Sequence, residues 1–376
     1  MRFFSKKIVE ISSIGFADII GSGISAIFWF YVASVLGPEK YGEISYFISI
    51  AGLASTISLM GSSNTITVFT AKNIPIQSAL YILTLFAGII SSIVVFLLFF
   101  NFGTSFLILM YIIFGLVIAE ILGKKLYKTY AKFVILQRLL MVSLSIGLYY
   151  MVGDNGILVG MALSMTPYVY GIIRGFLKNP IKFSLVRQKS GFIVNSYLQT
   201  LSGALSGSLD KIIIVPIFGF AILGNYSLGL QFFTLLTLLP TAGMKYLIPQ
   251  DSSGIENVKI KKIFVILSII IALIGFFMGP QVISLIFPKF IEAEEVIKII
   301  SFAVIPSTIT MTYQSKFLGQ EKSRNVLISS GIWTLTQIFG IIILGQIFQV
   351  NGIALALVLG ATVSSIYCVL VDRLRK

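Results

Sequence analysis

Residues 76–100 read IQSALYILTLFAGIISSIVVFLLFF, a run without a single charged side chain. A helix that crosses the hydrocarbon core of a bilayer needs about 20 mostly apolar residues, so this run is long enough to span a membrane. The rest of the chain has the same character, because 57% of its 376 residues are hydrophobic and only 11% are charged. A soluble domain carries about 25% charged residues. We therefore predict an integral membrane protein.

Apolar runs of this length recur between short polar or charged segments, and they predict twelve transmembrane helices. The runs are continuously apolar, whereas the strands of a transmembrane β-barrel alternate apolar and polar residues. The expected fold class is therefore an all-α membrane protein. The predicted spans are residues 11–36, 44–71, 76–100, 105–123, 133–152, 156–177, 191–218, 223–248, 263–279, 296–318, 326–348 and 352–370. Prolines are expected to kink four of these spans, at Pro167, Pro216, Pro240 and Pro306.

Lysine and arginine are distributed very unevenly among the predicted connections. When the connections are numbered alternately from the N-terminus, 24 of the 28 basic residues are on the inner side, three are on the outer side, and Lys211 lies within a span. Basic loops stay in the cytoplasm, so we predict a multi-pass protein of the cell membrane with both termini cytoplasmic. The net charge of +14 then reflects topology and contact with membrane lipids. No basic segment forms a separate domain, so no nucleic-acid partner is expected.

The two halves of the chain resemble each other. The sequence GDNGI at 153–157 precedes the sixth predicted span and QVNGI at 349–353 precedes the twelfth. We call the alignment that pairs Gly153 with Gln349 the first register. A second register aligns Gly37, Gly42 and Ser45 with Gly219, Gly224 and Ser227. We therefore predict two parallel six-helix repeats, related by an axis along the membrane normal, around a central cavity. The predicted lobes are residues 1–183 and 184–376.

Polar and small residues recur at helical spacing on one face of the first two helices of each half. Such a face is expected to contact protein or water rather than lipid. For the serines and glycines of these stripes, close helix packing is the simpler interpretation. The candidates for a substrate cavity or an ion-coupling site are Asp18, Asn64, Asn195, Gln199, Asp210, Lys211 and Gln231.

Four charged positions stand out within the spans. Asp18 lies well inside the first span, and a charged residue at such a depth is costly, so it is a candidate cavity acid or cation-coupling residue. Asp210 and Lys211 are adjacent, and neighbours on a helix point about 100° apart, so they need not pair with each other. Glu120, near the cytoplasmic end of the fourth span, is interpreted as a shielded helix-end acid.

The composition excludes several kinds of chemistry. Histidine is absent and Cys368 is the single cysteine, which removes the commonest metal ligand, an internal disulfide and any CxxC site. No P-loop and no dinucleotide fingerprint occur. We therefore expect no cofactor and no metal, and we do not expect an enzyme. Transport, if it is energised, would use an ion gradient.

Several motifs resemble those of oligosaccharide flippases, the polysaccharide-biosynthesis branch of the multidrug, oligosaccharidyl-lipid and polysaccharide exporter superfamily. The segment VLGPEKYGE at 35–43 is similar to the family's LGxxxYG turn. SLDK at 208–211, FG at 218–219 and LGNYS at 223–227 are similar to its SLDK…G…LGxYS pattern. IFPKF at 286–290 is a third similarity, in which Pro288 replaces the family's usual glycine.

The resemblance implies a transporter that flips lipid-linked oligosaccharides by alternating access, for the assembly of a surface polysaccharide or glycan. The polyprenyl carrier would leave its tails in the lipid while the sugar crosses the cavity, with Na⁺ or H⁺ as the open choice of coupling ion. A cavity for a pyrophosphate-linked glycan should also carry cations. The candidates for this role are Lys211, Lys245, Arg138 and Lys316.

Three other interpretations compete with this one. A cation-coupled exporter of small molecules or drugs, from the same superfamily, would favour an acidic cavity, which Asp18 and Asp210 permit. A membrane glycosyltransferase or glycan polymerase would need catalytic groups on sizeable outer loops, and most of the outer connections here are short. A non-transporting scaffold would leave the polar stripes without a purpose.

Overall fold

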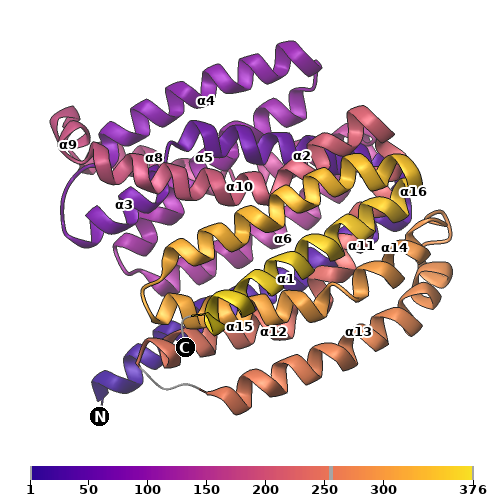
Figure 1. The fold of residues 1–376 in the computed structure, drawn as a ribbon. Helices are drawn as coiled ribbons and strands as arrows, with labels where there is room; N and C mark the ends of the chain where they lie inside the picture. The colour runs from indigo at the N-terminus through magenta and orange to yellow at the C-terminus, as the bar shows by residue number, and fades with distance from the viewer. Residues whose placement is uncertain (1, 254–256, 375–376) are drawn as a thin grey trace. The chain divides into compact units, whose positions relative to one another are not determined.

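The computed structural model describes residues 2–253 and 257–374, apart from the side chains of residues 2–14, 16, 242, 245, 246, 249 and 252. Every regular element in these residues is a helix (Figure 1), so the all-α prediction is confirmed. The helices are α1 (Arg2–Leu36), α2 (Pro38–Leu59), α3 (Ser62–Ala71), α4 (Gln77–Phe99), α5 (Phe102–Gly123), α6 (Tyr127–Val152), α7 (Asn155–Leu163), α8 (Pro167–Lys178), α9 (Phe183–Gln188), α10 (Ser190–Phe218), α11 (Phe220–Leu236), α12 (Leu238–Ser252), α13 (Val258–Ile286), α14 (Ala293–Ser301), α15 (Val304–Gly319) and α16 (Ser323–Arg373).

These helices account for the twelve predicted spans. Within the described residues, nine helical stretches are long and apolar enough to cross a membrane, and the pair α14–α15, bent by 42°, adds a tenth. The 51 residues of α16 contain two spans, because Gln349 at φ 49° and ψ −130° has a non-helical backbone. The remaining span is formed by α11, a shorter apolar helix, with α12 after it. The chain is therefore a multi-pass membrane protein.

Proline explains where several spans divide into two helices. Pro167 is the first residue of α8, and Pro240 and Pro306 lie in the first turns of α12 and α15. Proline has no backbone N–H, and the first turn of a helix is where that group would have no helical partner. A helix therefore begins at or just before three of the four prolines that were expected to kink a span, and the pair α14–α15, which contains Pro306, is bent by 42°. Helix α10, in contrast, continues through Pro216.

The backbone repeats itself in the first register found in the sequence. Lys125 (φ 57°) corresponds to Glu321 (φ 59°), and Gly153 (φ 79°) corresponds to Gln349 (φ 49°). Each pair places a left-handed residue in the same inter-helix turn of its half. Few residues adopt this conformation without a structural reason, so the shared turns support the predicted two-repeat arrangement.

The second register also corresponds to shared structure. Gly37 and Gly219, which it pairs, have φ values of 81° and 86° in the turns that precede α2 and α11. Further along, Gly42 and Gly224 bring α2 and α11 so close that a Cβ atom on either glycine would overlap the backbone of the other helix. The sequence match between these glycines therefore marks a direct contact between equivalent helices.

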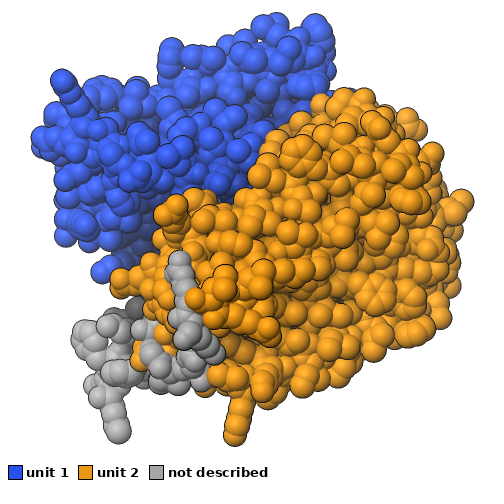
Figure 2. Space-filling model, in the orientation of Figure 1, with its two compact units in different colours: residues 1–29, 47–208 blue, residues 30–46, 209–376 orange. Residues whose placement is uncertain are grey.

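The described chain forms two compact units, coloured in Figure 2, and their boundaries lie within α1, α2 and α10. Unit 1 comprises residues 1–29 and 47–208, and unit 2 comprises residues 30–46 and 209–376. The division into lobes 1–183 and 184–376 stays a prediction. The core of unit 2 includes Ile214, Leu223, Tyr226, Val296, Ile300, Ile341 and Ile353. The most deeply buried side chains of unit 1 include Ile76, Leu107, Ile108, Ile112 and Leu116.

Candidate functional site

A polar cluster in unit 1 is built on α1 and α6. The Tyr130 hydroxyl, on α6, donates a hydrogen bond of 3.0 Å to Oδ1 of Asp18 on α1. Less than one turn after Asp18, a Cβ atom on Gly21 would lie 3.4 Å from Cγ of Arg138. The glycine thus lets the stem of Arg138 pack against α1, close to the Asp18 carboxylate along the helix.

Arg138 lies deep within the membrane-spanning helix α6. It is about three helical turns beyond Tyr127, where α6 begins, which corresponds to about 16 Å at 1.5 Å per residue. Its Nε atom is buried and has no hydrogen-bond partner among the described residues. Its Nη1 atom lies 3.9 Å from Sδ of Met141, a weak acceptor, and no carboxylate forms an ion pair with it in the described part of the chain. The guanidinium group therefore retains several free donors within the hydrocarbon region.

A buried tyrosine that packs against α6 adds a second free polar group. Tyr168, on α8, is 0% exposed, and its hydroxyl has no hydrogen-bond partner among the described residues. The rings of Phe114 and Phe133 pack edge-on against it, with centroid distances of 5.0 and 5.5 Å. Phe133 belongs to α6, the helix that carries Arg138 and Tyr130. Together, a guanidinium and an unpaired hydroxyl suit an anionic ligand with several acceptor oxygens.

Unit 2 contains a different cluster, centred on Asp210 of α10. Tyr226 of α11 donates a 3.1 Å hydrogen bond to Oδ2 of Asp210. Gln337 of α16 donates to the Tyr226 hydroxyl at 3.0 Å and lies 3.5 Å from the same carboxylate oxygen. The Lys211 ammonium is 3.6 Å from Oδ1 of Asp210, so these neighbours do form an ion pair. The Asp210 charge is therefore compensated, and the cluster joins three helices of unit 2.

The Asp210–Lys211 pair is expected to stabilise unit 2. Replacing Asp210 with asparagine removes the carboxylate charge 3.6 Å from the Lys211 ammonium, and we expect the free energy of unfolding to fall by about 2 kcal/mol. Removing both charges in D210N/K211Q should restore at least half of this loss. Unfolding in detergent micelles, followed by tryptophan fluorescence, measures both changes. A double variant as unstable as D210N alone would contradict this assignment.

The remaining candidates are amides that make no hydrogen bond in the described part of the chain. Asn64 on α3 and Asn195 and Gln199 on α10 are exposed side chains of unit 1, and Gln231 on α11 is half-buried in unit 2. The first three lie on helices that contact each other, because a Cβ atom on Gly61 would approach the α10 backbone at the Tyr197 nitrogen within 2.5 Å. These amides are free to bind a polar ligand.

Two of the four candidate cations give no support to a cationic cavity. Lys316 forms a 2.8 Å ion pair with Asp372, near the end of α16. Its positive charge is therefore balanced by a carboxylate of the protein. The side chain of Lys245 lies outside the described residues. Arg138 and Lys211 remain, and Lys211 is paired with Asp210.

The sequence did not identify Tyr130, Tyr168 or Gln337 as site residues. Tyr130 meets Asp18 across 112 positions and Gln337 meets Asp210 across 127, so no local spacing could connect them. Tyr226 could have been identified from the sequence, because it is the tyrosine of the LGNYS motif at 223–227.

Comparison with known proteins gives the fold. No protein-family model matches the sequence, and no curated protein matches it. Among solved structures, it is similar to the lipid II flippase MurJ in an inward closed conformation, with a TM-score of 0.74 and 14% identity over 96% of this chain and 87% of that one. An inward-facing multidrug resistance transporter of the MATE family has a TM-score of 0.70 and 16% identity over 94% of both chains.

A third similar structure is a transporter of the same MOP superfamily from Pyrococcus furiosus, described as having a binding pocket of reverse polarity that suggests a different function. Its TM-score is 0.64, with 15% identity over 97% of this chain and 95% of that one. The chain thus has the fold of the MOP-superfamily transporters over essentially its whole length.

Proposed function

We propose that this protein is a transporter that flips lipid-linked oligosaccharides across the cell membrane by alternating access, for the assembly of a surface glycan. The observation that carries the proposal is Arg138, a cation deep within a span that forms no ion pair in the described part of the chain. A charged side chain at this depth is costly unless it faces water, a partner or a ligand. The diphosphate of a polyprenyl-linked sugar would supply the missing anion.

The geometry around Arg138 fits a phosphate group. A guanidinium presents its donors in a planar fork that matches the oxygens of a phosphate, and the buried Tyr168 hydroxyl can add another donor. The exposed amides Asn64, Asn195 and Gln199 can exchange hydrogen bonds with sugar hydroxyls, since an amide is both a donor and an acceptor. The polyprenyl tail would stay in the lipid.

Export of small cationic molecules is the second candidate, because one of the similar structures is a multidrug resistance transporter. Such a cavity would need carboxylates that are free to bind a cation. Asp210 instead has a lysine and two hydrogen-bond donors around it. The charge balance therefore favours an anionic substrate. Deletion of the gene separates the two candidates, since flipping predicts loss of surface glycan and export predicts altered sensitivity to cationic drugs.

Asp18 is the residue we assign to ion coupling. It lies less than one turn along α1 from the point where Arg138 packs, so its negative charge competes with a phosphate for the guanidinium. A proton or Na⁺ at Asp18 would remove this competition and favour substrate binding. In D18N we expect transport in proteoliposomes to persist without any response to a proton or sodium gradient. If the variant retains the gradient dependence of the wild type, coupling occurs elsewhere.

A further inference from the structure

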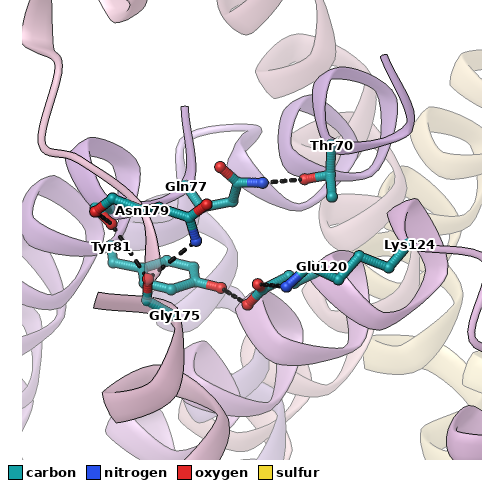
Figure 3. Close-up of polar contacts among 8 residues, drawn as sticks. Thr70, Gln77, Tyr81, Glu120, Lys124, Gly175 and Asn179 are labelled. Carbon is teal, nitrogen blue, oxygen red and sulfur yellow. Dashed lines mark hydrogen bonds and ion pairs between the residues drawn. The ribbon is translucent and has the colours of Figure 1, made fainter. Parts of the chain in front are cut away.

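A pocket of about 440 Å³ opens at the end of unit 1 where α3 and α5 end and α4 begins. It is lined by the turn between α3 and α4, by Gln77, by Lys124 and Lys125 after α5, and by Asn179 after α8. Of the lining residues, Figure 3 labels Thr70, Gln77, Lys124 and Asn179. Since membrane-spanning helices begin and end here, the pocket lies at the level where lipid headgroups meet water.

A buried carboxylate beside this pocket forms an ion pair with Lys124, one of the lining residues. Glu120 is 6% exposed and accepts a 2.5 Å hydrogen bond from the Tyr81 hydroxyl as well as an ion pair from Lys124 (Figure 3). A Cβ atom on Gly175 would lie 2.6 Å from the Tyr81 ring, so the glycine makes room for the tyrosine. Glu120 is thus shielded, as the sequence suggested, and it fixes the position of Lys124.

Gln77, which lines the pocket, has a side-chain acceptor without a partner in the described part of the chain. Its side chain is 3% exposed, and its Nε2 atom donates a 2.7 Å hydrogen bond to Oγ1 of Thr70. Its Oε1 atom is buried without a partner among the described residues. A buried amide oxygen left unpaired costs about 1–3 kcal/mol, so a ligand with a hydroxyl group would be stabilised here.

Lys125 brings a positive charge to the same pocket. Lys125, at φ 57°, lines it and forms no ion pair within the described residues. Gln77 is the first residue of α4, and the N-cap residue Ile76 makes no side-chain capping bond. The first N–H groups of a helix have no partner within it and attract anions, phosphate in particular.

The equivalent end of unit 2 has different side chains at this position. Gly319 corresponds to Gly123 in the first register, and a Cβ atom on it would meet Asp251, whereas one on Gly123 would meet Thr70. Asp251 accepts from Ser315 at 2.6 Å and pairs with Lys261 at 2.7 Å. The residue that contacts the equivalent glycine is therefore an ion-paired aspartate in unit 2 and the uncharged Thr70 in unit 1.

We infer that this pocket binds the headgroup of an anionic phospholipid that carries free hydroxyls, of the phosphatidylglycerol type. The phosphate would lie between Lys125, Lys124 and the start of α4, and a headgroup hydroxyl would donate to Oε1 of Gln77. The acyl chains have an apolar path nearby, because Phe86 on α4 is 66% exposed and Leu177 on α8 is 83% exposed. These exposed side chains favour a lipid over a soluble phosphate ester.

The test is lipid binding by the purified full-length protein, measured by native mass spectrometry during titration with phosphatidylglycerol or phosphatidylcholine. The wild type should retain phosphatidylglycerol at about tenfold lower lipid concentration than phosphatidylcholine. K125N should remove most of this preference; asparagine tolerates the left-handed backbone at position 125, so the change is one of charge. Q77E, which adds a negative charge inside the pocket, should have the same effect.

The matched control is K128N, which removes an exposed lysine of α6 that does not line the pocket, and it should leave the preference within about twofold. Equal retention of the two lipids by the wild type, or an unchanged preference in K125N and Q77E, would overturn the inference. Glycerol phosphate at millimolar concentration is added as a competitor and should not displace the lipid. Displacement would assign the pocket to a soluble phosphate ester and overturn the lipid assignment.

Discussion

Replacing Arg138 with glutamine is expected to slow the flipping of a lipid-linked oligosaccharide about 100-fold, which corresponds to about 2.7 kcal/mol. The estimate comes from charge-assisted hydrogen bonds, each of which contributes about 1.5–3 kcal/mol. Glutamine keeps most of the side-chain length but loses the charge and the forked donors. The rate is measured in proteoliposomes at equal protein content, from the accessibility of the labelled sugar to an enzyme added outside.

Two further variants distinguish phosphate binding from a general effect on α6. R138K keeps the charge but not the planar fork, so its rate should lie between those of R138Q and the wild type. K132Q removes an exposed lysine of the same helix and should change the rate less than about twofold. A rate for R138Q close to that of the wild type, in protein with an unchanged unfolding midpoint, would remove the main support for a phosphate-bearing substrate.

Replacing Gly42 with alanine is expected to lower the free energy of unfolding by at least about 3 kcal/mol, at the upper end for overpacking. The added methyl group would overlap the carbonyl oxygen of Phe220 and lie 2.7 Å from the backbone nitrogen of Gly224. Backbone atoms cannot rotate away as a flexible side chain can, so α2 and α11 must separate. Unfolding in detergent, followed by the fluorescence of the two tryptophans, measures the loss.

The matched control is a glycine in an open position. Gly147 is in α6, and no described atom lies within 4 Å of an added Cβ. Alanine favours a helix by about 1 kcal/mol over glycine, so G147A should be neutral or stabilising. G224A should resemble G42A, because its methyl group would overlap the carbonyl oxygen of Pro38. If G42A is as stable as G147A, the close contact between the equivalent helices is wrong.

The architecture was predictable because membrane helices leave a strong local signal in the sequence. Long apolar runs marked each span, and Pro167, Pro240 and Pro306 marked three places where a span divides. The repeat was also visible, since Gly42 and Gly224 occupy equivalent positions in the two halves of the sequence. Their mutual contact could not be read from the alignment, because a shared position does not imply a shared surface.

The candidate sites were less predictable because their partners are distant in the chain. Asp18 and Asp210 were found from their unusual depth, but their tyrosine partners lie on other helices. Arg138 was one of four candidate cations, and it is distinguished by its buried Nε atom without a partner and by the absence of an ion pair within the described residues. The pocket beside Gln77 left no signal in the sequence, because it depends on helix ends that meet only after folding.

Translocation of a labelled polyprenyl-linked oligosaccharide in vesicles that contain only this protein tests the central claim most directly. We predict that the sugar becomes accessible to an outside-added reagent faster than in empty vesicles, and that R138Q removes most of the difference. Rates equal to those of empty vesicles for several polyprenyl-linked glycans, together with efflux of an organic cation, would contradict the flippase and support the exporter.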